Sequence, residues 1–474
     1  MIDTKAIRSK ILDLAMRGQL TNQNPLEGTG FSLIEENYKI INTSSYDIKK
    51  RVGKNCKPIN QDDGLFKIPK SWCWERFGNL VLNFDNQRKP VTKSDRKRLF
   101  GQYDYYGATG AIDRVDDYIF DGDYLMIGED GGNFFVERDN SFIAHGRFWA
   151  NNHVHVVQPI ICNIYYLKAC LDSYNLPNMG LVYGIGAPKL NQENMNSIPI
   201  PVPPLAEQQR IVEKIGAVFS NLDTIDALQM QYADNLTVLK AKLIDVAIQG
   251  KLTEQLPEDG TAEELYKQIQ MEKQELIKAG KIKKEKPLPE FEEDEIPFEI
   301  PSNWKWVRLG EIATVLGGKR IPAGRSLTHE NTGHKYIRVS DMKDQTVQTN
   351  GLLYVPKDIY PSISQYIINK EDIYITVAGT IGRVGKIPPE IDGANLTENA
   401  DRIVFSHLNQ DWLIICLLSS AIQKQIERLT TSVAQPKLAI KRIQDFLIPL
   451  SPLAEQQRIV KHINEFINLC DNLK

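Results

Sequence analysis

The side chains in this sequence that are best suited to bind a ligand are basic, and they lie in short segments. The run RKPVTKSDRKR is the densest, and other basic residues follow the Gly317-Gly318 turn and lie in or after two Pro-Lys-Leu sequences. Lys and Arg bind phosphate oxygens without regard to sequence, and Arg also reads the edges of bases. A solvated surface is the commoner role of a charged run, so each cluster is a hypothesis. The predicted DNA contacts are Arg88, Lys89, Lys93, Arg96, Lys97, Arg98, Lys189, Lys319, Arg320, Arg325, Lys437, Lys441 and Arg442.

Motifs for catalysis are absent from the sequence. GTIGRVGKI has five residues between Gly379 and Gly385 and ends in Ile, so it lacks the spacing and the magnesium-binding hydroxyl of a phosphate-binding loop. No NPPF or DPPY tetrapeptide, of the kind that adenine methyltransferases place beside a flipped base, is present. Three histidines lie near one another without a Cys, and we expect ordinary sheet residues rather than a metal site: His145, His153 and His155. The sequence therefore predicts no catalytic residue, no metal and no cofactor in this chain.

The bulk composition fits a folded protein of two to four domains. The chain has 474 residues, of which 42% are hydrophobic and 25% charged, as in ordinary globular proteins. Its formal net charge of −3 argues against a protein that coats nucleic acid without sequence preference. The six cysteines form no Cys-x-x-Cys pair, and we find neither a secretion signal nor an apolar run of about eighteen residues. We therefore expect a cytoplasmic protein with reduced cysteines and no membrane segment.

An internal repeat organises the chain. PLAEQQRIV occurs at 204–212 and again at 452–460, with nine identities in nine positions and an offset of 248 residues. A second offset of 232 residues relates ILDLAMRGQLTNQNP to LIDVAIQGKLTEQLP, and IPKSWCWERFGNL to IPSNWKWVRLGEI. The two offsets differ by 16 residues, so the segment between the repeated parts is longer by 16 residues in the second unit.

The two ends of the chain complete the second copy of the repeat. At these offsets Lys474 falls on position 226 and Met1 falls on position 233, so only 227–232 lack a counterpart. The C-terminal and N-terminal segments together thus form a divided copy of the central segment. The chain is therefore a two-unit repeat that is circularly permuted.

The repeated central segment has the pattern of a long helix. Pro204 suits a first helical turn and Gly250 a stop, which predicts a helix of about 45 residues, roughly 65 to 70 Å long. A shorter helix is predicted from Thr261 to about Gly280, followed by a charged linker. The apolar positions of the long helix form a predicted heptad seam: Ile211, Ile215, Val218, Leu222, Ile225, Leu228, Tyr232, Leu236, Leu239, Leu243 and Val246. A coiled-coil scaffold without any ligand would explain this pattern equally well.

Two segments between the repeated parts read as mixed α/β domains, because short β-branched runs alternate with Gly, Asn and Asp. They are called the first and second variable domains here, since they share little sequence away from their edges. Two framed domains with different interiors suit a device that reads two different targets. The predicted segments are 1–25, half of the second helical region; 26–71, a connection; 72–203, the first variable domain; 204–285, the central helical region; 286–303, a linker; 304–451, the second variable domain; and 452–474, the C-terminal helix.

These motifs together resemble the specificity subunits of type I restriction-modification systems over nearly the whole chain. The resemblance rests on the LAEQQRI sequence after each variable domain, the LDLAMRGQL and LIDVAIQGKL ends, the IPxxWxW entries, and the AGTIG and QPKL turns. The first variable domain departs from the family at two turns, with IGEDGGNFF in place of ITVAGTIGRVG and GAPKL in place of AQPKL.

The resemblance implies an α+β fold in which two target-recognition domains are separated by two long antiparallel, coiled-coil-like helices with pseudo-twofold symmetry. It also implies that each domain reads one half of a split, asymmetric site in double-stranded DNA. The helices would dock two modification subunits, which use S-adenosylmethionine to methylate adenine, and restriction subunits that use ATP and magnesium would join them. The chain itself would be a non-catalytic subunit.

Two other classes of function are compatible with parts of the sequence. An orphan DNA-binding scaffold that acts without restriction partners would show the same repeat. A self-contained nuclease or methyltransferase would need activity in the purified chain, which the absent motifs argue against.

Overall fold

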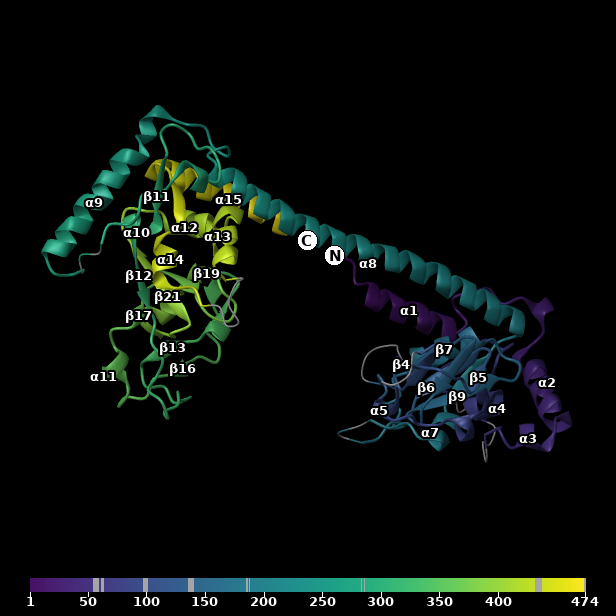
Figure 1. The fold of residues 1–474 in the computed structure, drawn as a ribbon. Helices are drawn as coiled ribbons and strands as arrows, with labels where there is room; N and C mark the ends of the chain where they lie inside the picture. Colours follow the sequence, from purple (N-terminus) through teal and green to yellow (C-terminus); the bar gives the residue numbers. More distant parts are fainter. Residues whose placement is uncertain are drawn as a thin grey trace. The chain divides into compact units, whose positions relative to one another are not determined.

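The computed structural model describes residues 1–53, 59–60, 64–96, 101–134, 140–184, 186, 188–282, 284, 286–430 and 437–472. The chain divides into two compact units, Met1–Met230 and Gln231–Lys474, and each is described by itself. Both contain a variable domain together with stretches of helix from the repeated segments (Figure 1).

The first unit opens with helices and continues into two sheets. Helices α1 (Thr4–Met16), α2 (Gly30–Thr43) and α3 (Tyr46–Lys49) precede the variable domain. Strand β1 (Cys73–Arg76) pairs antiparallel with β10 (Pro199–Val202). One sheet has the order β2-β9-β6-β7 and the other β4-β3-β8-β5. Their strands are β2 (Val81–Asn83), β3 (Tyr103–Gly107), β4 (Gly110–Val115), β5 (Phe120–Asp121), β6 (Tyr124–Gly128), β7 (Ser141–Ala144), β8 (Arg147–Ala150) and β9 (Val154–Pro159).

The shorter helices of the first variable domain are α4 (Phe77–Leu80), α5 (Lys93–Arg96), α6 (Ile164–Ser173) and α7 (Gln192–Asn196). The core of this unit joins strand residues to the frame helices, because Leu12 and Met16 of α1 pack in the same cluster as Trp72, Ile211 and Ile215. The variable domain is thus anchored on its own helices by apolar burial.

The second unit repeats this plan. Strand β11 (Lys305–Arg308) pairs antiparallel with β22 (Leu447–Leu450), and the sheets have the orders β12-β21-β18-β19 and β16-β13-β20-β17. Their strands are β12 (Ala313–Gly317), β13 (Lys335–Ile337), β16 (Leu353–Tyr354), β17 (Ile367–Ile368), β18 (Ile373–Thr376), β19 (Val384–Lys386), β20 (Ala394–Leu396) and β21 (Ala400–Phe405). A hairpin of β14 (Met342–Lys343) and β15 (Thr346–Val347) is added.

The helices of the second variable domain are α10 (Leu309–Ile312), α11 (Tyr360–Ile363), α12 (Gln410–Leu418), α13 (Ser420–Thr430) and α14 (Ile440–Gln444). The strand orders correspond one to one with those of the first unit, including a parallel pair, β3 with β8 and β13 with β20. The predicted fold class, with two mixed α/β domains of one architecture, is therefore confirmed.

Helix α8 (Leu205–Ile248) has 44 residues and confirms the long helix predicted between Pro204 and Gly250. It stops where Gly250 adopts a φ of 67°, a left-handed conformation that suits glycine. The shorter predicted helix is α9 (Ala262–Lys278), which begins with a capping box between Thr261 and Glu264.

The predicted heptad seam along α8 is buried only in part. Four of its positions are 58%, 37%, 46% and 38% exposed: Leu228, Tyr232, Leu239 and Val246. Burial follows the predicted seam at Ile211, Ile215 and Leu222 in the first unit and at Leu236 in the second, where Ala247 and Ile248 are buried as well. The physical reason is that α8 pairs with a short helix in each unit rather than with one continuous partner.

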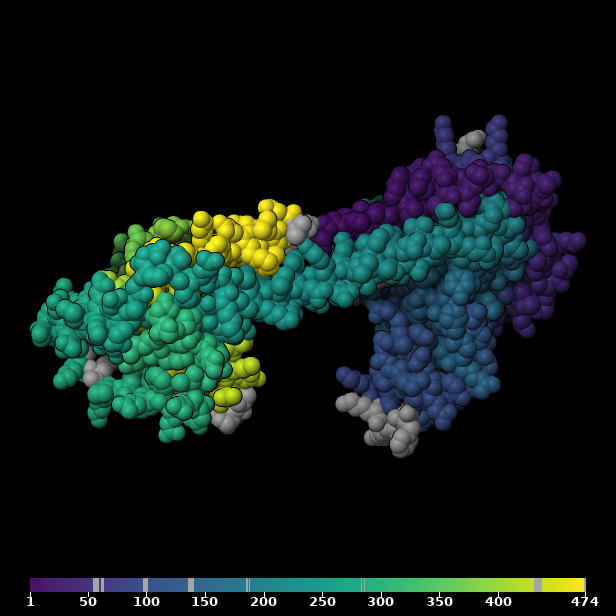
Figure 2. All heavy atoms as spheres, turned by 90° about the horizontal axis from the view of Figure 1, so that it is seen from above, coloured from purple at the N-terminus to yellow at the C-terminus, as the bar shows by residue number. Residues whose placement is uncertain are grey.

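Those partners are α1 in the first unit and α15 (Leu453–Asn472) in the second, and each lies along α8 (Figure 2). The Thr4 hydroxyl donates to Asp226 at 2.6 Å and Arg8 pairs with Asp223 at 2.7 Å. In the second unit Lys240 pairs with Asp471 at 3.3 Å. At the repeat offsets Arg8 corresponds to Lys240 and Asp223 to Asp471, so the same ion pair occurs in both units.

Candidate DNA interface

A buried glutamate joins the first variable domain to its helices. The carboxylate of Glu207, which is 1% exposed, accepts a hydrogen bond from Trp72 Nε1 at 2.9 Å. It also accepts from Gln23 Nε2 at 3.0 Å and from the Thr21 hydroxyl at 3.2 Å. Three donors from two repeated segments thus satisfy one buried carboxylate, as burial of a charge requires.

The second unit contains the same contacts. Glu455 is fully buried and accepts from Trp304 Nε1 at 2.7 Å, from Gln255 at 2.6 Å and from Thr253 at 2.8 Å. The next residue of the motif also has a matched role, because Gln208 and Gln456 donate to the carbonyls of Pro203 and Ser451. The LAEQQRI and IPxxWxW motifs are therefore the two sides of one joint, which fixes each variable domain on its frame.

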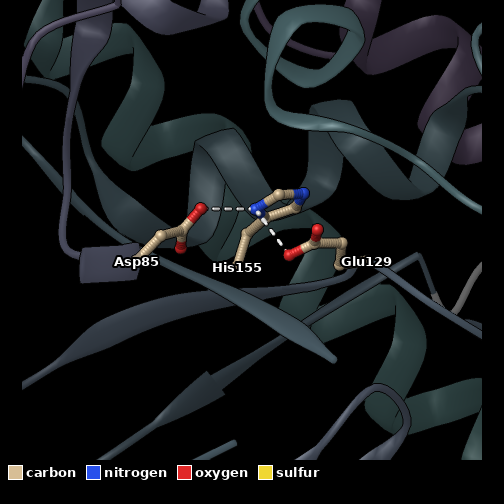
Figure 3. A group of neighbouring side chains, drawn as sticks. All are labelled: Asp85, Glu129 and His155. Carbon is tan, nitrogen blue, oxygen red and sulfur yellow. Dashed lines mark hydrogen bonds and ion pairs between the residues drawn. The ribbon is translucent and has the colours of Figure 1, made fainter. Parts of the chain in front are cut away.

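A polar cluster lies inside the first variable domain, at the ends of β2, β6 and β9 (Figure 3). His155 is 1% exposed, and its Nδ1 lies 2.6 Å from Asp85 Oδ2 and 3.7 Å from Glu129 Oε2. Its Nε2 lies 2.9 Å from the carbonyl oxygen of Leu190. Since a carbonyl only accepts, Nε2 is the donor there, and Nδ1 faces carboxylates. The imidazole thus joins β9 to Asp85 through one nitrogen and to the Leu190 carbonyl through the other.

Two cations complete this cluster. Arg88 donates to Glu129 at 2.7 Å and to the Val154 carbonyl at 2.7 Å, and Lys189 lies 3.5 Å from Glu129. Burial would raise the pKa of the Asp85 carboxyl, but the hydrogen bond from His155 and the charges of His155 and Arg88 hold that pKa below its ordinary value.

Asp85, Glu129 and His155 are also the group, within the described parts of the chain, that is close enough to hold a metal ion. Both nitrogens of the imidazole already face protein oxygens, and Glu129 already carries two cations. These contacts account for the cluster as an internal ion-pair network that needs no metal ion. It fixes the chain segments that carry Arg88 and Lys189.

The second variable domain has different residues at the corresponding places. Asp401 in β21 lies opposite Gly317 in β12, at the place where His155 lies opposite Asp85 in the first domain. Leu438 donates to the Val377 carbonyl, as Leu190 donates to the Glu129 carbonyl. The buried set of two acids and one histidine is thus replaced by one acid, Asp401. Burial raises the pKa of Asp401 to about 7, while the charge of Lys437 opposes that rise.

Three of the predicted basic residues of the second variable domain lie around a close crossing of two chain segments: Lys319, Arg320 and Lys437. A Cβ on Gly318 would lie 2.0 Å from the carbonyl oxygen of Thr397, so only glycine fits there. Arg320 is 72% exposed and pairs with Glu398 at 2.6 Å, while Lys437 Nζ donates to the Glu398 carbonyl at 3.4 Å. Lys319 is exposed beside them, with its ammonium 5.7 Å from the Tyr366 ring centroid.

The other predicted contacts are in several environments. Arg88 has its guanidinium inside the domain, and Arg96 pairs with Asp113 at 2.8 Å over the Tyr105 ring. Arg325 pairs with Asp358. The remaining residues of the set have exposed side chains: Lys89, Lys93, Lys441 and Arg442. Lys97 and Arg98 lie outside the described residues.

The other two histidines of the sequence cluster pair with nearby acids. His145 Nδ1 lies 2.8 Å from Asp123, and His153 Nδ1 lies 3.4 Å from Asp130, so the three histidines do not share a site. Sequence reasoning missed Asp85 and Glu129, because only the strand register brings them to His155. The buried joint at Glu207 had a usable signal, since every residue in it belongs to a repeated motif.

None of the helices in the described part of the chain combines the length and the apolar character needed to cross a lipid bilayer.

The fold and these surfaces define a class: a scaffold of long helices that carries two like α/β domains with different polar interiors. Residues 78–231 and 301–474 match the type I restriction modification DNA specificity domain. Because the matches cover more than half of the chain, it belongs to this family, the non-catalytic DNA specificity subunits of type I restriction-modification systems.

Individual relatives agree with the family. The chain is 26% identical to the EcoEI type I restriction enzyme specificity subunit of Escherichia coli, over 99% of this chain and 90% of the relative. It is 23% identical to the MjaVIII specificity subunit of Methanocaldococcus jannaschii, over 85% and 88%. A solved structure from work on complex assembly and conformational transition of the type I system matches with a TM-score of 0.52 at 18% identity, over 86% and 93%, which supports the fold.

Proposed function

We propose that each variable domain reads one half of a bipartite, asymmetric site in double-stranded DNA. The observation that carries this proposal is the contrast between an identical joint at Glu207 and Glu455 and the different residues at the strand ends. A shared joint holds both domains in the same way, while different residues at the strand ends suit different targets.

The DNA contacts that we propose come from the basic residues with exposed side chains. In the second variable domain these are Lys319, Arg320 and Lys437, with Lys441 and Arg442 beyond them; in the first they are Lys89 and Lys93, with Lys189 partly exposed. Arg88 and Arg96 are more strongly held inside the domain and would position these neighbours. Substituting Arg320 by Ala should relax one base position if it reads a base, and weaken all sequences alike if it holds phosphate.

The long helices would dock two modification subunits, one on each unit. Apolar side chains remain exposed there: Ile2 before α1, Ile7 of α1 and Leu228 of α8 in the first unit, and Leu239 and Leu469 in the second. At the offset of 232 residues Ile7 corresponds to Leu239, and these residues are 38% and 46% exposed. An exposed apolar residue at the same repeat position in each unit favours two copies of one partner.

A stoichiometry measurement tests this docking. Ile7→Glu and Leu239→Glu should each reduce the bound modification subunits from two to one, because a charge would be buried in one of the two interfaces. Lys39→Glu, on α2 outside these surfaces, should leave two bound subunits. Two bound copies in both apolar variants would contradict the proposed surfaces.

Catalysis and its cofactors would reside in the partners: S-adenosylmethionine in the modification subunits, and ATP with magnesium in restriction subunits. The helix α8, with its 44 residues, spans about 66 Å at 1.5 Å per residue and would act as the spacer between the half-sites. Such a complex acts on cellular DNA, which would place the chain in the cytoplasm.

The test is to map N6-methyladenine on host DNA by single-molecule sequencing, with the modification subunit co-expressed and this chain present or absent. A split, asymmetric motif that depends on this chain would support the proposal and give both half-sites. Methylation that is unchanged without the chain would favour an orphan DNA-binding scaffold instead.

A further inference from the structure

Two lysines occupy the same backbone positions in both variable domains, although these domains differ elsewhere. The first pair is Lys89 and Lys319. The backbone N–H of Lys89 donates to the carbonyl of Ala150, the last residue of β8, at 3.2 Å, and that of Lys319 donates to Leu396, the last residue of β20, at 2.8 Å. Their carbonyls also accept from aromatic side chains, Trp149 and Tyr336.

The second pair is Lys189 and Lys437. Each immediately precedes a leucine whose N–H donates, at 2.9 Å, to the first residue after an equivalent strand: Glu129 after β6 and Val377 after β18. The side chains of Lys319 and Lys437 are exposed, as is that of Lys89, while Lys189 is 35% exposed.

An arginine and a glutamate tie the two lysine-bearing segments together in each domain. In the first, Glu129 bonds both Arg88, next to Lys89, and Lys189. In the second, Glu398 bonds Arg320, next to Lys319, through its side chain and Lys437 through its carbonyl. The glutamates come from different strand ends, yet the result is the same: one glutamate joins the two segments that carry the lysines.

We propose that Lys89 with Lys189, and Lys319 with Lys437, are equivalent anchors for DNA backbone phosphates. This inference rests on the proposed function and names the residues that grip DNA without choosing its sequence. Residues that recur at one place in two domains with different targets are suited to the part of DNA that does not vary, the phosphate. Base choice then belongs to the residues that differ.

The first anchor is weaker than the second, because acids offset its charge. Lys189 pairs with Asp130 at 3.0 Å, and its hydrogen bond to Asp130 raises the pKa of Lys189 while that of Asp130 is lowered. Ala378 stands at the place of Asp130 in the second domain. The backbone N–H of Asp130 donates to the carbonyl of His153, and that of Ala378 donates to the equivalent carbonyl of Asn399.

The test measures how the affinity of the full chain for a random duplex of about 30 base pairs falls with salt. Because phosphate contacts ignore sequence, the target need not be known. Lys319→Gln and Lys437→Gln should each reduce the slope of log affinity against log salt by about 1. Lys89→Gln should do the same, and Lys189→Gln should have a smaller effect. Lys39→Gln on α2 and Lys267→Gln on α9 are controls that should leave the slope unchanged.

Asp130→Ala gives the first domain the residue of the second and should tighten binding about threefold to tenfold at low salt, with the gain fading as salt rises. Unchanged slopes in Lys319→Gln and Lys437→Gln, with wild-type binding intact, would overturn the anchors alone. A wild-type chain without affinity for duplex DNA would also count against the proposed function. We expect all these variants to fold, because the substituted side chains are exposed or partly exposed, and a melting curve of each variant checks this.

Discussion

The two variable domains have the same strand order and the same joint to their helices, but they have different side chains at the ends of three equivalent strands. The first domain buries Asp85, Glu129 and His155 together with Arg88. The second has Gly317, Val377 and Asp401 at those places. The contacts that the two domains share therefore lie where each domain meets its frame, and the residues that differ lie where the strands end beside the basic residues.

This difference also shows how one fold can change its surface without changing its support. In the first domain a buried ion-pair network draws Arg88 inward. In the second domain, Arg320 extends to the surface and is held by Glu398. The arrangement of buried acids thus decides which basic side chains remain available to a ligand.

The largest expected effect comes from removing the histidine of the first network. His155→Ala removes two hydrogen bonds from the domain interior, to Asp85 and to the Leu190 carbonyl, and leaves a cavity, which should destabilise the first unit by about 3 to 5 kcal/mol. Hydrogen exchange along a denaturant series would report the two units separately. We expect protection to fall in β2, β6 and β9 and to remain in the second unit; a loss below about 1 kcal/mol would show that the network does not support the domain.

The joint should respond equally in the two units. Glu207→Ala and Glu455→Ala each leave a buried Trp N–H and two further donors without an acceptor. Each should lower the free energy of unfolding of its own unit by about 3 kcal/mol. Glu207→Gln and Glu455→Gln keep an acceptor and serve as milder controls. Chemical denaturation of the four variants checks this, and unequal losses at the two glutamates would argue against a common joint.

Asp401 should make the stability of the second unit depend on pH. Its pKa is raised to about 7 by burial, against an ordinary value of 3.8. The native state therefore keeps a proton that the unfolded chain releases, and stability present below pH 3.8 is lost as the pH rises toward 7. Asp401→Asn should remove this loss, so its advantage over wild type should grow from pH 5 to 7 and then level off.

Each pKa unit corresponds to about 1.4 kcal/mol, which places the Asp401→Asn advantage at a few kcal/mol at most. Melting temperatures at pH 5, 6, 7 and 8 are the measurement. An advantage that is constant over this range would mean that Asp401 does not titrate there.

The smallest expected effect concerns the matched ion pairs of the frame. Arg8→Ala and Lys240→Ala remove contacts to Asp223 and Asp471 that are partly open to solvent. Each should lower the melting temperature by about one degree at low salt and less at high salt. A shift of many degrees for either variant would give these pairs a greater structural role.

Sequence reasoning recovered the frame because its residues recur. The long helix up to Gly250, the short helix from Thr261 and two like α/β domains all followed from repeats and helix ends. The seam was recovered only in part, because Leu228 and Tyr232 have the right spacing but lie in 227–232, which has no counterpart in the divided copy. Spacing records which face is apolar, and it does not record where a partner helix ends.

The candidate interface was less accessible to sequence reasoning. Arg88 and Lys89 are neighbours in one basic run, yet Arg88 lies inside the domain and Lys89 is exposed. Only the register that brings Asp85 to His155, 70 residues away, separates their roles. A run of charges predicts a surface, and the buried acids that select among its members come from distant strands.

The central claim is that the frame is common and the variable domains act independently. The most direct measurement exchanges residues 304–451 for the corresponding segment of another family member, at the Trp304 and Ser451 junctions, and maps N6-methyladenine with the modification subunits present. The account predicts that one half of the methylated motif changes while the other half and the spacer stay the same. A motif in which both halves change would contradict it.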